Sequence, residues 1–282
     1  MMAARQKTAL MTDIRRKSSA TGTVLAPDGV PIRYEDAGRG NPVIVFVHGW
    51  SCDRSYWTPQ AEHFSKSHRV VSVDLGGHGE SGVEREDWTM AAFGADVAAV
   101  LEALDLRNAV LVGHSMGGPV IVETALLAPD HVAALVSVDH FADVDRPMSV
   151  VDRETQLARL HNDFRGATEA WVRTFFPAGA DPSLVDGIVR DMANAPPDIA
   201  ISALDHVRRY DEASGLAKTQ LPMGMINSDL WLTNLNAARR HKPDIGLSVM
   251  RGVGHFPHLE DSEAFNRLLA RAVRDLWHES NG

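Results

Sequence analysis

The sequence lacks several features that would point to particular classes of protein. Cys52 is its only cysteine, which excludes an intramolecular disulfide and a cysteine zinc cluster and fits a reducing compartment. No run of about 18 apolar residues occurs, so we expect no membrane span. Outside the first twenty residues there is no dense stripe of lysine and arginine, and the formal net charge is -9. Neither nucleic acid nor an anionic membrane surface is therefore expected as a partner.

What is present is an ordinary globular composition. The 282 residues are 44% hydrophobic and 23% charged, enough for one large domain with a generous core. Arg15, Arg16 and Lys17 are not followed by an apolar stretch, so we expect a frayed tail, not a secretory signal, with translation starting at Met1 or Met11. We expect a cytoplasmic protein whose partner is a small-molecule substrate, and the sequence leaves a homodimer open.

Continuous apolar runs alternate with segments of helical period. Such runs are typical of strands that are buried on both faces of a parallel sheet. Upstream, residues 22–38 contain an Asp-Gly turn between two half-buried runs, which predicts an antiparallel hairpin at the sheet edge. The fold class is therefore predicted as α/β, a mostly parallel sheet with helices on both faces. The expected buried strands lie in residues 42–50, 69–79, 108–115 and 132–139, and the expected helices between them in 56–67 and 88–106.

The alternation stops after Asp139. The next buried run is residues 221–227, and the chain between them shows helical stretches punctuated by "FFPAGADPS" and "NAPPDIA". This length is too great for a loop in a compact domain, so we expect an inserted helical cap. The predicted organisation is a tail at residues 1–22, an α/β core at 23–141 and 216–282, and the cap at 142–215.

The segment "NAVLVGHSMGG", residues 108–118, places a Gly-x-Ser-x-Gly pattern between a buried strand and an Ala-rich helix. Gly113 and Gly117 permit the sharp bend that this connection requires. Ser115 is then held at the carboxyl end of the sheet, beside the free amides and partial positive charge of a helix N-terminus. These features indicate a nucleophile.

A serine nucleophile needs a base within hydrogen-bond reach, and His255 is the candidate. It follows the last expected strand and lies between a glycine and the final helix. His255 is therefore expected on the same edge of the sheet as Ser115. His258 is interpreted as structural.

Three motifs resemble those of the α/β-hydrolase superfamily over residues 23–278. They are "HGW" at 48–50, "DLGGHGES" at 74–81, and "GHSMGG" at 113–118 followed by "GVGHF" at 252–256. The resemblance implies that the amides of Trp50 and Met116 form an oxyanion hole, which stabilises the charge that develops on a carbonyl oxygen. Trp50 in this position is similar to cofactor-free serine esterases of the haloperoxidase-related branch. In the family, Asp74 shapes the site without taking part in catalysis.

The acid that orients the histidine has two candidates. Members of the family usually carry an aspartate nine residues beyond the proline of the "LPMGMIN" strand, where this chain has Trp231. Asp229 could serve if the loop is shorter. Asp139, at the end of "VAALVSVD", occupies the alternative place, which resembles haloalkane dehalogenases. We favour Asp139. Dehalogenation is not expected, because that chemistry needs an aspartate nucleophile where this chain has Ser115.

Other residues have structural interpretations. Cys52, near the oxyanion loop, is taken as a packed residue and not a second nucleophile. The histidines form no His-x-x-x-His pair on a helix with a nearby acid, so no metal and no other cofactor is expected. Three aromatic residues of the expected cap, Trp171, Phe175 and Phe176, either line an apolar acyl pocket or pack against the core. The expected cap also contains Phe164 and Tyr210.

The sequence favours a cofactor-independent serine hydrolase that cleaves a small carboxylic ester or related acyl compound. Alternatives on the same residues are a lactonase, a carbon–carbon bond hydrolase and a perhydrolase, because one fold supports many chemistries. A protein of another class, a ligand-binding or signalling homologue with slow turnover, also fits. A structural member in which neither aspartate reaches His255 is a third alternative.

Overall fold

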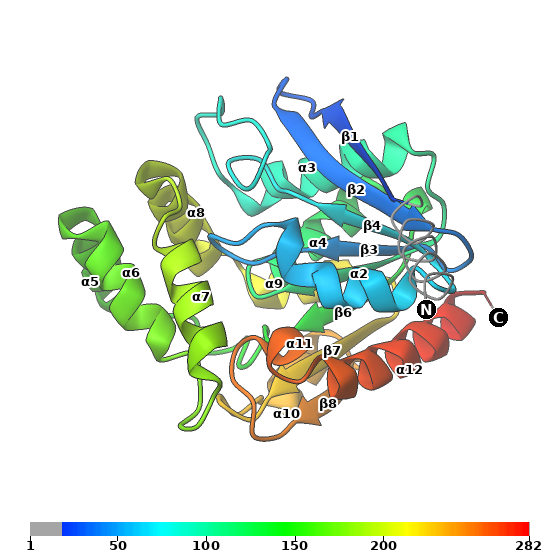
Figure 1. Cartoon of the computed structure of the whole chain (residues 1–282). Helices are drawn as coiled ribbons and strands as arrows, with labels where there is room; N and C mark the ends of the chain where they lie inside the picture. Colours follow the sequence, from blue (N-terminus) through cyan, green and yellow to red (C-terminus); the bar gives the residue numbers. More distant parts are fainter. Residues whose placement is uncertain (1–18, 282) are drawn as a thin grey trace, which may run out of the picture.

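The structure is a computed structural model that describes residues 19–281 (Figure 1). Within this range eight strands form one sheet in the order β1-β2-β4-β3-β5-β6-β7-β8. β1 (Ser19–Leu25) and β2 (Pro31–Gly38) form the antiparallel hairpin at one edge, and β2 also pairs antiparallel with β4. The other neighbouring pairs are parallel, so the predicted α/β fold class is confirmed. The expected tail up to residue 18 lies outside the described residues, and residues 19–22, expected in that tail, belong to β1.

The parallel strands are short, and the central ones are almost purely apolar. Each residue of β3, β5 and β6 is buried, which is why these stretches form strands with both faces covered. The register pairs Val47 with Gly113 and His114 with Val138, so neighbouring strands end close together. The strands are β3 (Ile44–Val47), β4 (Arg69–Val73), β5 (Ala109–His114), β6 (Val132–Val138), β7 (Met223–Ser228) and β8 (Gly246–Met250).

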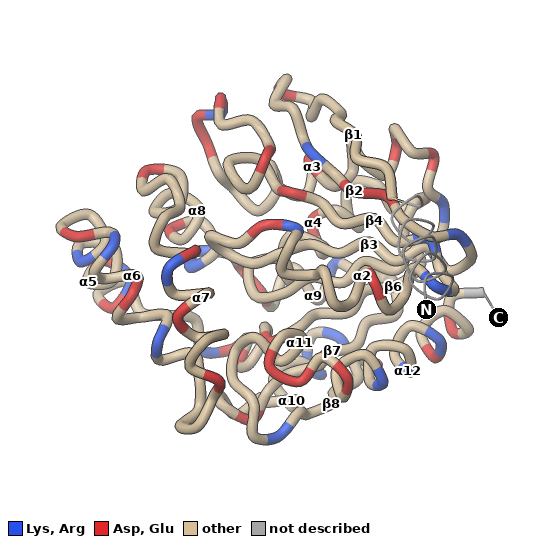
Figure 2. The backbone as a smooth tube through the Cα atoms, viewed as in Figure 1, with Lys and Arg blue, Asp and Glu red and all other residues tan. Residues whose placement is uncertain are grey.

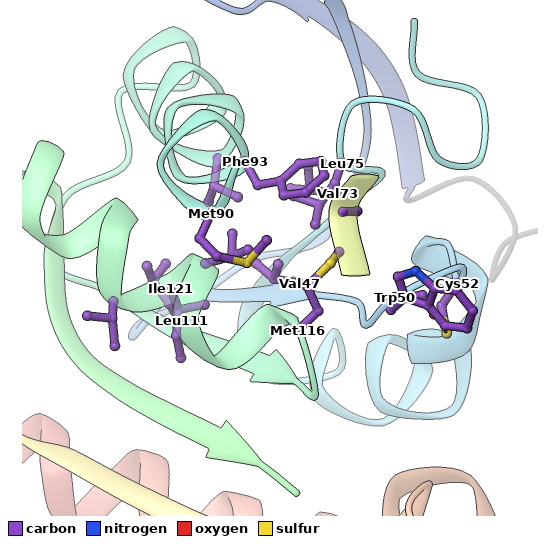
Figure 3. Packing of buried hydrophobic residues seen from close by; sticks show 14 of the residues in the cluster. Val47, Trp50, Cys52, Val73, Leu75, Met90, Phe93, Leu111, Met116 and Ile121 are labelled. Atoms are coloured by element: carbon purple, nitrogen blue, oxygen red, sulfur yellow. The ribbon is translucent and has the colours of Figure 1, made fainter. Parts of the chain in front are cut away.

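Helices cover both faces of the sheet (Figure 1). Along β3, Ile44 and Phe46 pack toward one face while Val45 and Val47 pack toward the other, because side chains alternate along a strand. Figure 3 shows part of the hydrophobic cluster on the face of Val45 and Val47, in which Val47 meets residues from the strands and helices around it. One face carries α2 (Thr58–Phe64), α11 (Pro257–Glu260) and α12 (Ser262–Asn281), and the other α3 (Met90–Ala103) and α4 (Gly117–Leu127). Shorter elements are η2 (Arg54–Trp57), η3 (Pro129–His131) and α10 (Leu235–His241).

Five helices between β6 and β7 form the segment that we call the inserted helices. In Figure 1, α5 to α8 lie beyond one end of the sheet. Three of these helices, α6, α7 and α9, begin at an aspartate whose side chain accepts a hydrogen bond from an amide of the first turn. The aspartates are Asp163, Asp181 and Asp211. Acidic and basic residues are scattered over these helices, whereas the centre of the sheet carries none (Figure 2). They are α5 (Val150–Asn162), α6 (Phe164–Arg173), α7 (Pro182–Met192), α8 (Pro197–Arg209) and α9 (Glu212–Lys218).

The length and apolarity of the helices also bear on membranes. Among residues 19–281, no helix is both long enough and apolar enough to cross a bilayer.

Candidate active site

Ser115 lies at a tight turn between β5 and α4. Its φ of 51° is in the left-handed region, and its amide donates to the Val138 carbonyl at 2.9 Å, which extends the β5–β6 ladder by one residue. A Cβ atom at Gly113 would overlap the Gly117 carbonyl oxygen, so only glycine fits there. The turn holds the serine hydroxyl partly exposed at the strand end, as the sequence pattern predicts.

His255 lies in the loop between β8 and α11 and faces the serine. Its Nε2 atom is 2.9 Å from Ser115 Oγ. Two backbone contacts hold the loop: the His255 amide donates to the Phe175 carbonyl at 2.8 Å, and His114 Nε2 donates to the His255 carbonyl at 2.6 Å. The imidazole is therefore fixed from the inserted helices on one side and from the nucleophile turn on the other.

Asp139 follows β6 and contacts the other side of the imidazole. Its Oδ2 atom accepts from His255 Nδ1 at 2.6 Å, and its Oδ1 atom accepts from the Ser228 amide at 2.7 Å. Burial raises the pKa of the Asp139 carboxyl, but the His255 and Ser228 contacts outweigh it, so this pKa lies below its ordinary value. Asp139 is therefore ionised at neutral pH and can stabilise a protonated imidazole.

Asp229, the other candidate acid, points elsewhere. Its side chain is exposed, and its Oδ1 atom accepts from the Gly252 amide at 2.9 Å, which stabilises the turn after β8. Trp231, at the family's usual acid position, packs its ring 5.1 Å from the His255 ring. Of the two aspartates, the structure brings Asp139 and not Asp229 to the histidine.

The two backbone amides expected to form an oxyanion hole belong to Trp50 and Met116. Met116 is the N-cap residue of α4, and Trp50 follows Gly49 in the loop after β3. Within the described range, neither amide donates a hydrogen bond. A Cβ atom at Gly49 would lie 3.1 Å from Ser115 Cβ, so this glycine lets the loop approach the serine closely. Both amides are thus without an acceptor in the described range; Met116 directly follows Ser115, and Trp50 directly follows the glycine that approaches it.

His48 orients one of these amides, a role that the sequence analysis missed. Its Nδ1 atom donates to the Gly49 carbonyl at 2.8 Å, and its Nε2 atom accepts from the Leu75 amide at 3.0 Å. Because C=O and N–H of one trans peptide point in opposite directions, fixing the Gly49 carbonyl turns the Trp50 amide the other way. Burial lowers the pKa of His48 to about 4, so the ring stays neutral. The His-Gly pair after a buried strand was the available signal.

Two aromatic rings pack against His255, Phe175 from the inserted segment and Trp231 from the loop after β7. The Phe175 ring is 4.9 Å from the imidazole and 5.8 Å from the Trp231 ring. Trp171 lies 5.0 Å from Phe175 and 5.3 Å from Trp50. These rings form an apolar wall that limits the access of water to the imidazole.

The remaining expected aromatics lie farther out. Phe164 packs edge-on to Trp50 at 6.3 Å, and Phe176 stacks on Phe256 at 5.5 Å. The Tyr210 hydroxyl donates to Glu123 on α4 at 2.8 Å. These residues join the inserted helices to the core.

Three residues given structural interpretations have structural contacts. Asp74 is buried, and its carboxylate accepts from the amides of Arg54 and Glu80 at 2.7 and 2.9 Å, which shapes the turn after β4. Cys52 is buried, and burial raises the pKa of its thiol well above the ordinary value, so it is not a ready nucleophile. His258 stacks on Trp57 at 4.3 Å, and burial lowers its pKa to about 3.

The sequence profile of the α/β hydrolase fold family matches residues 42–186, more than half of the chain. The chain belongs to the α/β-hydrolase family. This assignment agrees with the strand order and with the turn at Ser115.

Two known proteins and one solved structure show what the chain is similar to. A protein from Escherichia coli O9:H4 named as a carbamate hydrolase, RutD, is 27% identical over 88% of this chain and 96% of its own length. A non-heme chloroperoxidase from Streptomyces lividans is 42% identical over 42% of this chain and 44% of its own length. The solved structure of an esterase from Thermogutta terrifontis is 25% identical, with a TM-score of 0.80 over 91% of this chain and 99% of that one. The chain is a hydrolase of the esterase- and haloperoxidase-related branch.

Proposed function

We propose that this hydrolase is a serine esterase that cleaves a small carboxylic ester or a related acyl compound and needs no cofactor. One observation carries the proposal. Ser115, His255 and Asp139 form a continuous series of hydrogen bonds, 2.9 and 2.6 Å long, beside the free amides of Trp50 and Met116. This is the arrangement that nucleophilic acyl transfer requires.

In the first half of the reaction, Ser115 Oγ attacks the ester carbonyl while its proton passes to His255 Nε2. The carbonyl oxygen becomes an oxyanion that accepts from the amides of Trp50 and Met116, where one such donor contributes about 3 kcal/mol. The carbon–oxygen bond to the alcohol then breaks, and His255 returns the proton to the departing oxygen. Asp139 stabilises the imidazolium throughout, and the product is an acyl-serine with a free alcohol.

In the second half, water replaces the alcohol. His255 Nε2 takes one proton from the water as its oxygen attacks the acyl carbon, and a second oxyanion forms at the same amides. The bond to Ser115 Oγ breaks, and the serine oxygen regains the proton from His255. The carboxylic acid leaves, and the site returns to its starting state.

The relatives support this chemistry. A carbamate and an ester both present a carbonyl carbon attached to a nitrogen or oxygen leaving group, so one acyl-transfer site can serve either. We also propose that the inserted helices act as a cap over the site. The hydrogen bond from the His255 amide to Phe175 and the one from Trp50 Nε1 to the Ala200 carbonyl, 2.6 Å long, support that role.

The test is burst kinetics with p-nitrophenyl acetate and p-nitrophenyl butyrate. We expect the wild type to release a burst of one p-nitrophenol per chain followed by turnover, and Ser115→Ala to show neither. Ser183→Ala, which changes an exposed serine on α7, is the matched control and keeps the burst. A fluorophosphonate should label Ser115 in the wild type and the control. A folded wild type with no burst and no label would refute the proposal, as would a burst in Ser115→Ala.

A further inference from the structure

The inner face of α8 ends in a basic residue, Arg208. Ala200, Ile201 and Leu204 on this face are buried, and Arg208 follows Leu204 by four residues, about one helical turn. The Trp50 ring donates to the Ala200 carbonyl, which ties this face to the loop that carries the proposed oxyanion amide. Arg208 therefore lies on the side of the helix that faces the site.

The guanidinium of Arg208 lies over the aromatic wall around His255. Its central carbon is 5.6 Å from the centre of the Trp171 ring. Trp171 contacts Trp50 on one side and Phe175 on the other, and Phe175 contacts His255. Two rings thus connect the guanidinium to the imidazole.

Arg208 carries a charge that the described residues do not neutralise by contact. Its Nε atom is buried without a hydrogen-bond partner, and within residues 19–281 no carboxylate lies at ion-pair distance from the guanidinium. Glu212 attracts the guanidinium from a distance, but its carboxylate is in contact with His140 Nε2, at 3.1 Å, and not with Arg208. Burial lowers the pKa of Arg208 and Glu212 partly offsets this, and a guanidinium remains charged at neutral pH.

Other basic residues of the inserted helices are either paired or exposed. Arg153 and Arg209 both pair with Asp205, and Arg173 pairs with Asp186. A largely buried charge without a partner is costly, and an incoming anion would offset that cost. Arg165 pairs with Glu169, while Arg159, Arg190 and Lys218 are exposed.

The direction of the proposed reaction decides which part of a substrate would reach this charge. His255 protonates the leaving alcohol, so the alcohol lies on the side of the imidazole. The Trp50 amide holds the carbonyl oxygen, and the Trp50 ring contacts Trp171, over which Arg208 lies. An acyl chain that extends from the carbonyl past the Trp50 ring would follow Trp171 toward the guanidinium.

We propose that Arg208 binds a carboxylate at the far end of the acyl chain, so that the preferred substrates are esters of dicarboxylic acids or similar anionic acyl compounds. The inference rests on the proposed function. A guanidinium offers a planar pair of N–H donors that matches a carboxylate, and the neighbouring rings match the methylene groups between the two ends.

The test compares two esters that differ mainly in charge, p-nitrophenyl hemiglutarate and p-nitrophenyl pentanoate. The readout is the ratio of their kcat/KM values, after subtraction of the rates with Ser115→Ala. We expect the ratio to favour the hemiglutarate in the wild type and to fall on the order of 10- to 100-fold in Arg208→Gln. Arg208→Lys keeps the charge without the planar fork, so an intermediate ratio is expected. The matched control, Arg159→Gln, removes an exposed charge from α5 and should change the ratio less than about twofold.

The outcomes separate this inference from the proposed function. If the pentanoate gives a Ser115-dependent burst but the ratio is the same in wild type and Arg208→Gln, the role of Arg208 is refuted and the esterase proposal stands. If neither ester is cleaved, the esterase proposal fails, and binding is measured by thermal unfolding with glutarate. Stabilisation of the wild type and Arg159→Gln, but not of Arg208→Gln, would support the anion site, and equal shifts would refute it. Should Arg208→Gln not fold, two other measurements decide the question. The kcat/KM ratio should be lower on the order of severalfold in Arg208→Lys, and the wild-type ratio should fall by a similar factor between 0.05 and 0.5 M salt. If neither ratio changes, the role of Arg208 is refuted.

Discussion

The central strands and the inserted helices hold their residues in different ways. All residues of β3, β5 and β6 are buried and none is Asp, Glu, Lys or Arg, whereas α5 buries only Leu160 among its 13 residues. Ser115 and Asp139 extend the backbone ladder directly beyond β5 and β6. The inserted helices instead attach to the core mainly through buried apolar side chains, and ion pairs such as Arg153 with Asp205 and Arg173 with Asp186 join the helices to one another.

This difference has a consequence for function. Backbone ladders define positions to within a fraction of an ångström, as a reaction centre requires, whereas exposed ion pairs contribute little to stability. Exposed side chains of the inserted helices can therefore change without moving Ser115 or His255. We expect reaction chemistry to be determined at the sheet edge and substrate choice to be determined by the inserted helices.

The largest effect is expected at the sheet edge, for Asp139→Asn. The amide side chain cannot accept from His255 Nδ1–H in the same way, which favours the wrong tautomer, and kcat for p-nitrophenyl butyrate should fall about 10⁴-fold. The matched variant Asp229→Asn, at an exposed residue that binds the Gly252 amide, should lower kcat less than about tenfold. A larger loss in Asp229→Asn than in Asp139→Asn would reverse the assignment of the acid.

A pair of glycine substitutions tests the same comparison in stability. Gly113→Ala places a Cβ atom against the Gly117 carbonyl oxygen and should lower the free energy of unfolding by about 3 kcal/mol. Gly187→Ala, in α7, meets nothing within 4 Å and should raise it by about 0.5 to 1 kcal/mol, because alanine favours the helix. Urea unfolding measures both. Equal effects at the two sites would show that the inserted helices are packed as tightly as the sheet edge.

Acid stability should depend on histidines buried in the core. Burial holds the pKa of His48 at about 4 and that of His258 at about 3, below the ordinary 6.5. Between pH 6.5 and these lower values, the unfolded chain therefore binds more protons than the folded chain. The contribution of the two neutral histidines to the free energy of unfolding is fully present above pH 6.5 and is lost as the pH falls toward 4 for His48 and toward 3 for His258. Each extra proton bound on unfolding costs about 1.4 kcal/mol per pH unit. Urea unfolding at pH 7, 6 and 5 should show this slope, and His258→Phe should flatten it. An unchanged slope in that variant would exclude His258 as a contributor.

The smallest effect is expected on the surface of the inserted helices. Arg173 on α6 and Asp186 on α7 form an ion pair of 2.9 Å, and both side chains are more than half exposed. Arg173→Ala should change the free energy of unfolding by less than about 1 kcal/mol, because water screens the pair and ordering two long side chains opposes it. A double-mutant cycle with Asp186→Ala measures the coupling. A coupling of several kcal/mol would mean that these helices depend on their charges.

Much of the fold could be predicted from the sequence because strong local signals agree with the tertiary structure. The valine-rich runs, the Asp-Gly turn and the glycines around Ser115 each favour one local conformation, and the structure confirms the hairpin and the mostly parallel sheet. The position of His255 after the last strand was readable for the same reason. Parallel strands bring their carboxyl ends to one edge whatever the loops between them do.

What the sequence by itself determined was the order of strands and helices, and which residue types stand at the ends of the strands. Only the tertiary structure decided which aspartate contacts His255, since Asp139 and Asp229 both directly follow strands, and the first is buried against the imidazole while the second is exposed and binds the Gly252 amide. It also decided that His48 orients the Gly49–Trp50 peptide and that Arg208 lies over Trp171. These contacts join residues that are far apart in the sequence and meet only when the whole core has formed. Local conformational preferences act within a few residues, so they do not predict such contacts.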